Sequence, residues 1–271
     1  MNPFARIGLV IVAAIFLVAL SAPIISPADP DHQTLSEKLN GPSAEHPFGQ
    51  DPAGRDILSR IIYGTRVSML VGFATVAVSV LVGLLMGSLA GYFGKTLDEI
   101  IMRAIDVLQA FPGILLAIAL IAVLGPSLRN VVLALSALGW VGYARIVRGQ
   151  FLALREMEFV TAARALGAGD ARIILRHILP NIWAPIIVQA TFGVAAAILG
   201  EATLSFLGLG AQGIPSWGAM LNEGVDFLMV APHISIFPGM ALMMTILGLN
   251  FLGDGLRDKL DPRMRAFGAS A

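Results

Sequence analysis

The polar residues that could do chemistry in this chain are concentrated in one stretch, residues 156–181, between two apolar segments. Four arginines lie in it or directly beside it: Arg155, Arg164, Arg172 and Arg176. A stretch this polar cannot lie in hydrocarbon, and clustered arginines are typical of the cytoplasmic side of a membrane protein. Small residues and helical spacing within it predict a surface that binds another protein, so the expected chemistry is recognition rather than catalysis.

Reactive side chains are scarce elsewhere. The chain has no cysteine, which excludes thiol catalysis, disulfides and thiolate-bound metals. Its four histidines are scattered without metal-ligand spacing, so no metal site is predicted. No segment matches a P-loop, so we expect ATP to bind elsewhere than on this chain. An intramembrane enzyme is an alternative, but the zinc-protease pattern HExxH is absent and no Ser/His pair shares one membrane depth.

Composition indicates that the solvent of this chain is a lipid bilayer. Of 271 residues, 56% are hydrophobic and only 13% are charged, whereas soluble domains carry about 25% charged residues. The formal net charge is zero, which gives no indication of a nucleic-acid partner, and we expect none. Membrane lipid is the first partner that the sequence predicts.

Six segments are long enough to cross a bilayer, which takes about 20 helical residues. We therefore predict an all-α membrane protein with six transmembrane helices. The segments are Ile7–Ile25, Val67–Ala90, Ile100–Leu124, Val131–Val147, Ile182–Leu199 and Ile234–Leu252. The first could instead be a cleaved signal peptide, because small residues lie near its end. Against this, its apolar run continues to Ile25 and contains Pro23.

The distribution of charge predicts the orientation. With the N-terminus inside, most of the 18 lysines and arginines lie in cytoplasmic parts, as the positive-inside rule requires. Both termini are then cytoplasmic. The expected organisation is a first helix (1–26), an outer loop (27–66), a five-helix core (67–253) that contains the polar stretch 156–181, and a cytoplasmic tail (254–271).

The polar stretch itself predicts two short helices joined by a glycine break. Phe159, Ala162, Ala163 and Leu166 share one helical face. Gly167 and Gly169 then end the first helix, and Asp170 is expected to cap the second. Pro180 ends or kinks that second helix. One interpretation is a solvated basic loop that only sets the topology, but such a loop needs no apolar face. The pattern therefore favours docking of this stretch into a groove on a soluble partner.

This stretch resembles the EAA loop of ABC-transporter permeases. Thr161-Ala162-Ala163, Gly167 and Leu179-Pro180 carry the resemblance. Thr161 replaces the usual Glu and His177 replaces an Ile, as in the permeases for dipeptides, oligopeptides and nickel. Blocks that resemble the second permease subunit of those systems run through the chain: 46–69, 202–210, 215–221 and 249–263.

The resemblance implies a type I ABC importer permease fold with a cytoplasmic coupling-helix loop. A second permease, two ATPases that bind ATP with Mg, and an extracytoplasmic solute-binding protein would be its partners, in a prokaryotic inner membrane. The chain itself would be a non-catalytic subunit. The residues expected to couple to the ATPases are Glu158, Thr161, Ala162, Ala163, Arg164, Leu166, Gly167, Ala168, Asp170, Leu179 and Pro180.

The resemblance favours di- or oligopeptides as cargo, with nickel chelates, glutathione or another small solute as alternatives. A stand-alone secondary transporter would need carboxylates or broken helices near the midplane. Only Asp106 with Pro112 approaches that pattern.

Polar residues on the outer side have two interpretations each. Glu201 either lines the solute pathway or caps the chain where it enters the outer loop. Asp51, Arg55, Asp56 and Arg60 either contact a binding protein or form local salt bridges. Trp217 is expected at the interface, at the outer mouth or against the binding protein.

Two further patterns concern helix packing. Gly83, Gly87 and Gly91 form a small-residue face, either within the subunit or toward a second permease. Charges at the start of the third segment are expected to neutralise one another through Glu99–Arg103 and Arg103–Asp106.

Overall fold

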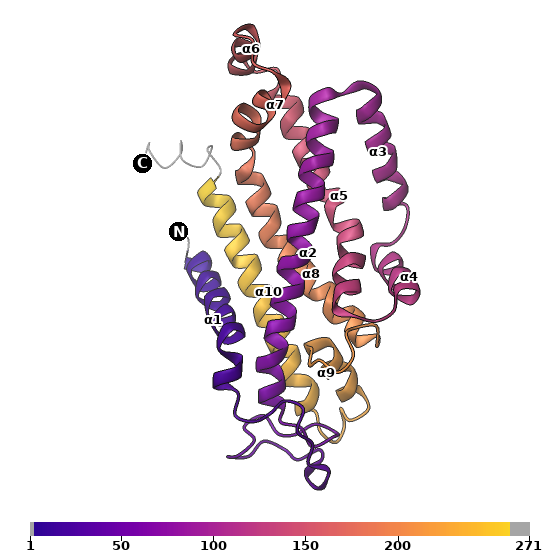
Figure 1. Ribbon diagram of the computed structural model, residues 1–271. Coiled ribbons are helices and arrows are strands. Elements are labelled where there is room, and N and C mark those ends of the chain that lie inside the picture. Colours follow the sequence, from indigo (N-terminus) through magenta and orange to yellow (C-terminus); the bar gives the residue numbers. More distant parts are fainter. Residues whose placement is uncertain (1–2, 261–271) are drawn as a thin grey trace.

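The computed structural model describes residues 3–260, and these form a bundle of long helices with short helices at both ends (Figure 1). The long helices are α1 (Pro3–Ile25), α2 (Ile57–Phe93), α5 (Leu128–Leu154), α8 (Trp183–Phe206) and α10 (His233–Leu260). Each of them is long and apolar enough to span a membrane. No strand occurs among the described residues.

The third predicted segment is interrupted. The predicted helix Ile100–Leu124 is two helices, α3 (Lys95–Gln109) and α4 (Gly113–Leu124), bent by 85°. Pro112 lies in the break with an extended backbone, φ −58° and ψ 124°. A proline lacks the N–H that a continuous helix needs and disfavours a helical residue before it, so the chain turns there. The bundle thus has five straight spans and one bent pair.

The second helix begins earlier than predicted. It starts at Ile57, so the outer loop ends at residue 56 instead of residue 66. Asp56 caps it, since its carboxylate accepts hydrogen bonds from the backbone N–H of Ser59 at 2.7 Å and from the Ser59 hydroxyl at 2.6 Å. The polar residues of this turn hid the start of the helix in the hydropathy pattern. α10 likewise continues to Leu260, so 254–260 are helical, and the rest of the predicted tail lies outside the described residues.

Close contacts between small residues hold the helices together. α2 packs along α5, and α1 packs along α10. A side chain at Gly83, Gly87 or Gly91 would collide with α5, around Tyr143, Ala144 and Phe151 respectively. The glycine face of the second helix therefore serves packing within the subunit.

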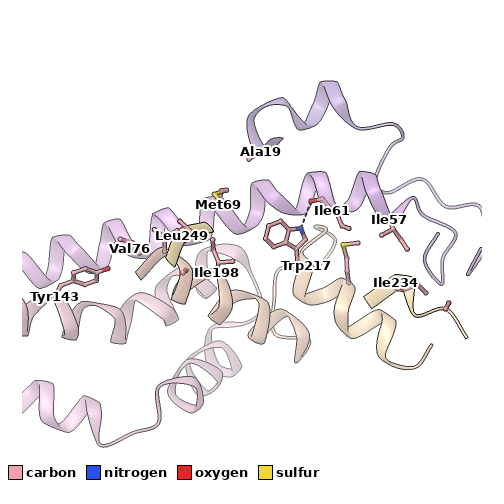
Figure 2. Packing of buried hydrophobic residues seen from close by; sticks show 14 residues of the cluster. Ala19, Ile57, Ile61, Met69, Val76, Tyr143, Ile198, Trp217, Ile234 and Leu249 are labelled. Carbon is pink, nitrogen blue, oxygen red and sulfur yellow. Dashed lines mark hydrogen bonds between the residues drawn. The ribbon is translucent and has the colours of Figure 1, made fainter. Parts of the chain in front are cut away.

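The largest apolar cluster lies between α2, α8, α9 (Trp217–Val225) and α10 (Figure 2). Trp217 belongs to this cluster and is only 1% exposed. Its indole N–H donates a hydrogen bond to the Ile61 carbonyl, with 3.1 Å between nitrogen and oxygen. A buried indole needs such a partner. The interfacial and binding-protein roles predicted for Trp217 are therefore wrong, because the residue belongs to the core.

Candidate functional site

The predicted docking stretch forms one end of the molecule (Figure 1). It comprises α6 (Glu158–Ala165), a turn, α7 (Asp170–Arg172), a π-helical segment (Ile173–Ile178) and a 3-10 turn (Leu179–Asn181). Glu158 lies in the first turn of α6 and Arg164 in its last, and both placements suit the helix dipole. We call residues 156–181 the docking loop.

α6 points one face into the bundle and the other away from it. Val160 is buried in a cluster with Tyr92 of α2, Phe151 of α5 and the π-helical segment, and Ala163 is also buried. Phe159 is 40% exposed and Leu166 is 88% exposed. Of the four residues predicted to share a face, Ala163 turns inward, whereas Phe159, Ala162 and Leu166 are exposed. Exposed apolar side chains on a short protruding helix are typical of a docking surface.

Gly167 ends α6 with a left-handed residue. Its φ is +83°; the Ala168 N–H bonds to Ala163 O and the Gly167 N–H to Arg164 O, each at 3.0 Å. This is the Schellman arrangement, which favours glycine at the left-handed position. The predicted glycine break is confirmed.

Asp170 does not cap the second helix as predicted. Gly169 occupies the capping position, and Asp170 is the first helical residue. Its carboxylate instead accepts a hydrogen bond at 2.6 Å from the hydroxyl of Tyr92, at the inner end of α2. Arg155 adds a second tie by donating to the carbonyl of Gly91 at 3.0 Å. Sequence reasoning missed Tyr92, because nothing in the pattern pairs residues so far apart in the chain.

The second half of the docking loop is irregular around Pro180. Ile173 and Ile178 are buried. The π-helical segment ends just before Leu179 and Pro180, and a 3-10 turn follows. Proline removes a backbone donor and crowds the preceding turn, so the regular helix is lost there. The helical segment thus ends before Pro180, one of the two outcomes that the sequence predicts for this residue.

Replacing Tyr92 by phenylalanine tests the tie to α2. The variant keeps the ring in its apolar cluster and removes only the bond to Asp170. We expect the protein to fold and insert normally, and the docking loop to exchange its amide hydrogens about tenfold to a hundredfold faster, because one charge-assisted bond contributes about 1.5–3 kcal/mol. Unchanged exchange over residues 166–172 would show that the bond does not hold the loop. Tyr63→Phe is the matched control, since Tyr63 lies at the other end of α2.

At the opposite end, four charged side chains form a network. Arg60, 4% exposed, pairs with Asp51 and with Glu223, whose two carboxylate oxygens lie 2.6 and 3.1 Å from its guanidinium. Arg55 bonds to Asp51 at 2.6 Å and to Glu223 at 3.0 Å. The network fastens the outer loop and α2 to α9. We call Asp51, Arg55, Arg60 and Glu223 the outer network.

The outer network decides between the two interpretations of the outer polar residues. Asp51 is fully buried and Asp56 is 3% exposed, with His46 at 2.9 Å from its carboxylate. Local salt bridges are therefore what the structure shows, and neither carboxylate offers a surface to another protein. Arg55 keeps some exposure, so its contact with a binding protein stays a prediction.

Glu201 is buried where α9 packs on α8, and its carboxylate accepts from the Ser205 hydroxyl at 2.6 Å. Because α8 continues to Phe206, the capping interpretation of Glu201 is wrong.

The outer network predicts a pH dependence. Burial acts to raise the pKa of Glu223, but the hydrogen bonds and charges of Arg60 and Arg55 outweigh it and hold that pKa below its usual value of 4.5. A depressed pKa stabilises the fold above the unfolded-state value, and this contribution is lost as pH falls through the folded-state value. We expect the thermal unfolding midpoint to fall steeply below pH 4.5. A Glu223→Gln variant should show a flatter profile over the same range.

The charges of α3 pair mainly with α5. Arg103 bonds to Glu99 at 2.7 Å, as predicted, but Asp106 pairs with Arg145 on α5 at 3.0 Å instead of with Arg103. Asp98 binds Arg148, also on α5, at 2.5 Å. These pairs fix the bent α3 to the bundle. In residues 3–260 no group of three His, Asp or Glu side chains is arranged to hold a metal ion.

A bundle of apolar helices, each long enough to cross a bilayer, defines a membrane protein. Residues 79–266 match the family described as binding-protein-dependent transport system inner membrane component, and residues 1–42 match the N-terminal transmembrane domain of oligopeptide transport permease C. The chain belongs to this family, and is thus the permease component of an ABC importer and a multi-pass membrane protein.

Relatives and solved structures agree with this assignment. The chain is 48% identical to a dipeptide transport system permease protein of Alkalihalophilus pseudofirmus, over 98% of this chain and 88% of that protein. It is 45% identical to a glutathione transport system permease protein of Escherichia coli O157:H7, over 97% and 89%. The fold is similar to inward-facing forms of the MetNI methionine ABC transporter, with a TM-score of 0.61 at 17% identity over 76% of this chain and 98% of that one. The predicted type I importer permease fold is confirmed.

Proposed function

We propose that this chain is one of two permease subunits of an importer for dipeptides or similar small peptides, and that its docking loop couples transport to ATP hydrolysis by two partner ATPases. The observation that carries the proposal is the exposed apolar tip of α6. Leu166 is 88% exposed beside the left-handed Gly167. Asp170 ties this loop to α2, and Arg155, the residue just before the loop, bonds to the same helix.

Coupling then follows from the connection between loop and bundle. A knob of helix seated in a cleft of an ATPase moves with that ATPase when ATP, held there with Mg, draws the two together. Tyr92 and Arg155 would transmit the movement to α2, which reaches the outer network. A rigid-body rocking of this kind is one of the recognised two-state transitions. The chain binds no nucleotide in this scheme and acts as a non-catalytic subunit.

The cargo and setting follow from different observations. The relatives named above transport a dipeptide and glutathione, both small and peptide-like, and this supports peptides over nickel chelates. The surplus of lysine and arginine on the side of the docking loop supports a prokaryotic inner membrane with both termini in the cytoplasm. The partners would be a second permease, two ATPases and an extracytoplasmic solute-binding protein.

Uptake in cells tests the cargo. A strain that lacks this chain should lose ATP-dependent uptake of labelled alanylalanine or of labelled glutathione, and should recover it when the chain is restored. Uptake of both solutes that is unaffected by removal of the chain would contradict a peptide cargo.

Substitution of Gly167 by valine tests the coupling role. A β-branched residue at φ +83° is strained by about 1–3 kcal/mol, although no neighbour lies within 4 Å of an added side-chain carbon. We expect normal insertion and at least a tenfold loss of ATP-dependent uptake, since strain of that size equals about one or two factors of ten. Gly149→Val also meets nothing within 4 Å and lies in helical α5, so it is the matched control. Normal ATP-coupled uptake by the Gly167 variant would refute the coupling assignment.

A further inference from the structure

The outer loop between α1 and α2 contains one peptide bond whose two residues can react with each other. Of the six asparagines in the chain, only Asn40 is followed by a glycine. Asparagine is a thermolabile residue, because the backbone nitrogen of the next residue can attack its side-chain amide. A glycine at that next position has no side chain to hinder the approach. This loop lies at the end of the molecule away from the docking loop (Figure 1).

The structure leaves the attacking group free and its target accessible. Asn40 and Gly41 are both exposed and lie outside the helices. Among residues 3–260, the Gly41 N–H has no hydrogen-bond acceptor and the Asn40 side chain has no hydrogen-bond partner. Both residues line a surface cleft of about 350 Å³, so water reaches them. The geometry therefore opposes neither the attack nor a later hydrolysis.

Another exposed asparagine shows what protection looks like in this chain. The side-chain amide of Asn181 donates to the His177 carbonyl at 2.6 Å, and the residue after it is Ile182. Its amide is thus held away from the next nitrogen, and a β-branched side chain crowds that nitrogen. Asn181 is a control that every molecule carries.

From these features we propose that Asn40 converts spontaneously into aspartate and isoaspartate. The Gly41 nitrogen forms a bond to the Asn40 side-chain carbonyl carbon, and the side-chain nitrogen leaves with the Gly41 proton as ammonia. The product is a cyclic imide. Water then adds to one of its two carbonyls and the bond from that carbonyl to nitrogen breaks. Addition at the side-chain carbonyl gives aspartate, and addition at the backbone carbonyl gives isoaspartate.

The conversion loosens the outer loop. The Asn40 carbonyl accepts a hydrogen bond from the Gln50 N–H at 2.9 Å, and the Gln50 side chain donates to the Glu37 carboxylate at 2.9 Å. In isoaspartate the chain runs through the side-chain carbon, and the former backbone carbonyl becomes a free carboxylate, so this pairing loses its geometry. Both products also add a negative charge to a cleft lined by Glu37 and Glu45, and like charges repel.

Mass spectrometry of the full-length purified chain, before and after prolonged incubation at growth temperature, tests the proposal. We expect the peptide that contains Asn40 to gain the mass difference between an amide and a carboxylic acid. It should separate into two products, one of them isoaspartate, while the peptide that contains Asn181 stays unchanged. Conversion of Asn40 no faster than that of Asn181, or conversion to aspartate without isoaspartate, would overturn the cyclic imide.

Gly41→Ala is the matched variant. Gly41 does not have a left-handed backbone, and within residues 3–260 nothing lies within 4 Å of an added side-chain carbon, so the fold accepts alanine. The methyl group hinders the attack, and we expect conversion several-fold slower than in wild type. The thermal unfolding midpoint should fall during incubation of the wild type and stay constant in the variant. Equal rates of conversion would refute attack by the Gly41 nitrogen, and a constant midpoint in converted wild type would refute the loosening of the outer loop.

Discussion

A Leu166→Glu variant should assemble in the membrane but fail to retain the partner ATPases. Leu166 is 88% exposed at the end of α6 and touches little within its own chain, so its replacement leaves the fold intact. Burial of a leucine at an interface contributes about 1.5–3 kcal/mol, and a carboxylate placed there adds a desolvation cost. We therefore expect ATPase affinity to fall by at least about tenfold to a hundredfold.

The matched control is Met229→Glu. Met229 is 97% exposed and lies between α9 and α10, at the end of the bundle opposite α6 (Figure 1). The same charge is introduced on an exposed apolar residue, but away from the docking loop. Retention of the ATPases by the Met229 variant and their loss from the Leu166 variant would locate the interface. Equal recovery with both variants would contradict docking through α6.

An Arg60→Ala variant should be strongly destabilised. Arg60 is 4% exposed and neutralises Asp51, which is fully buried. Removal of one partner of a buried ion pair leaves an uncompensated charge, which costs about 3–5 kcal/mol. Arg55 still reaches Asp51 but is itself shared with Glu223, so it offsets only part of the loss. The thermal unfolding midpoint of the purified protein should drop sharply.

Arg103→Ala serves as the control for charge removal. The Arg103 side chain is 77% exposed and that of its partner Glu99 61%, and exposed pairs contribute about 0–1 kcal/mol. The two variants therefore remove the same kind of side chain from a buried and from an exposed pair. A midpoint for Arg60→Ala as close to wild type as that of Arg103→Ala would show that the outer network does not hold the outer end together.

The straight helices were predictable because their signal is local. About twenty apolar residues in a row have one stable arrangement in a bilayer, and each of the five straight spans overlaps a segment that hydropathy predicts. The bend at Pro112 was visible only as an interruption, since a proline in a membrane segment can either kink a helix or end it. The early start of α2 was hidden because Asp56, Arg60 and Arg66 make its first turns polar.

The candidate site was predictable in part for the same reason. The helix break at Gly167 follows because glycine adopts a left-handed backbone at little cost. The end of the helical segment before Pro180 follows because proline lacks the backbone N–H that a helix needs. The role of Asp170 was predicted wrongly because its partner, Tyr92, lies 78 residues away in the chain. Arg60 and Glu223 are likewise 163 residues apart. Contacts between residues this far apart in the chain can be identified only in the folded bundle.

The most direct test of coupling through the docking loop is to purify this chain, tagged, from its native membrane, to identify what accompanies it by mass spectrometry, and to assay ATP hydrolysis. We expect a second permease, ATPase subunits with P-loops, and hydrolysis that a solute-binding protein stimulates. Recovery of the chain alone, as a stable homo-oligomer without ATPase activity, would contradict coupling through the docking loop.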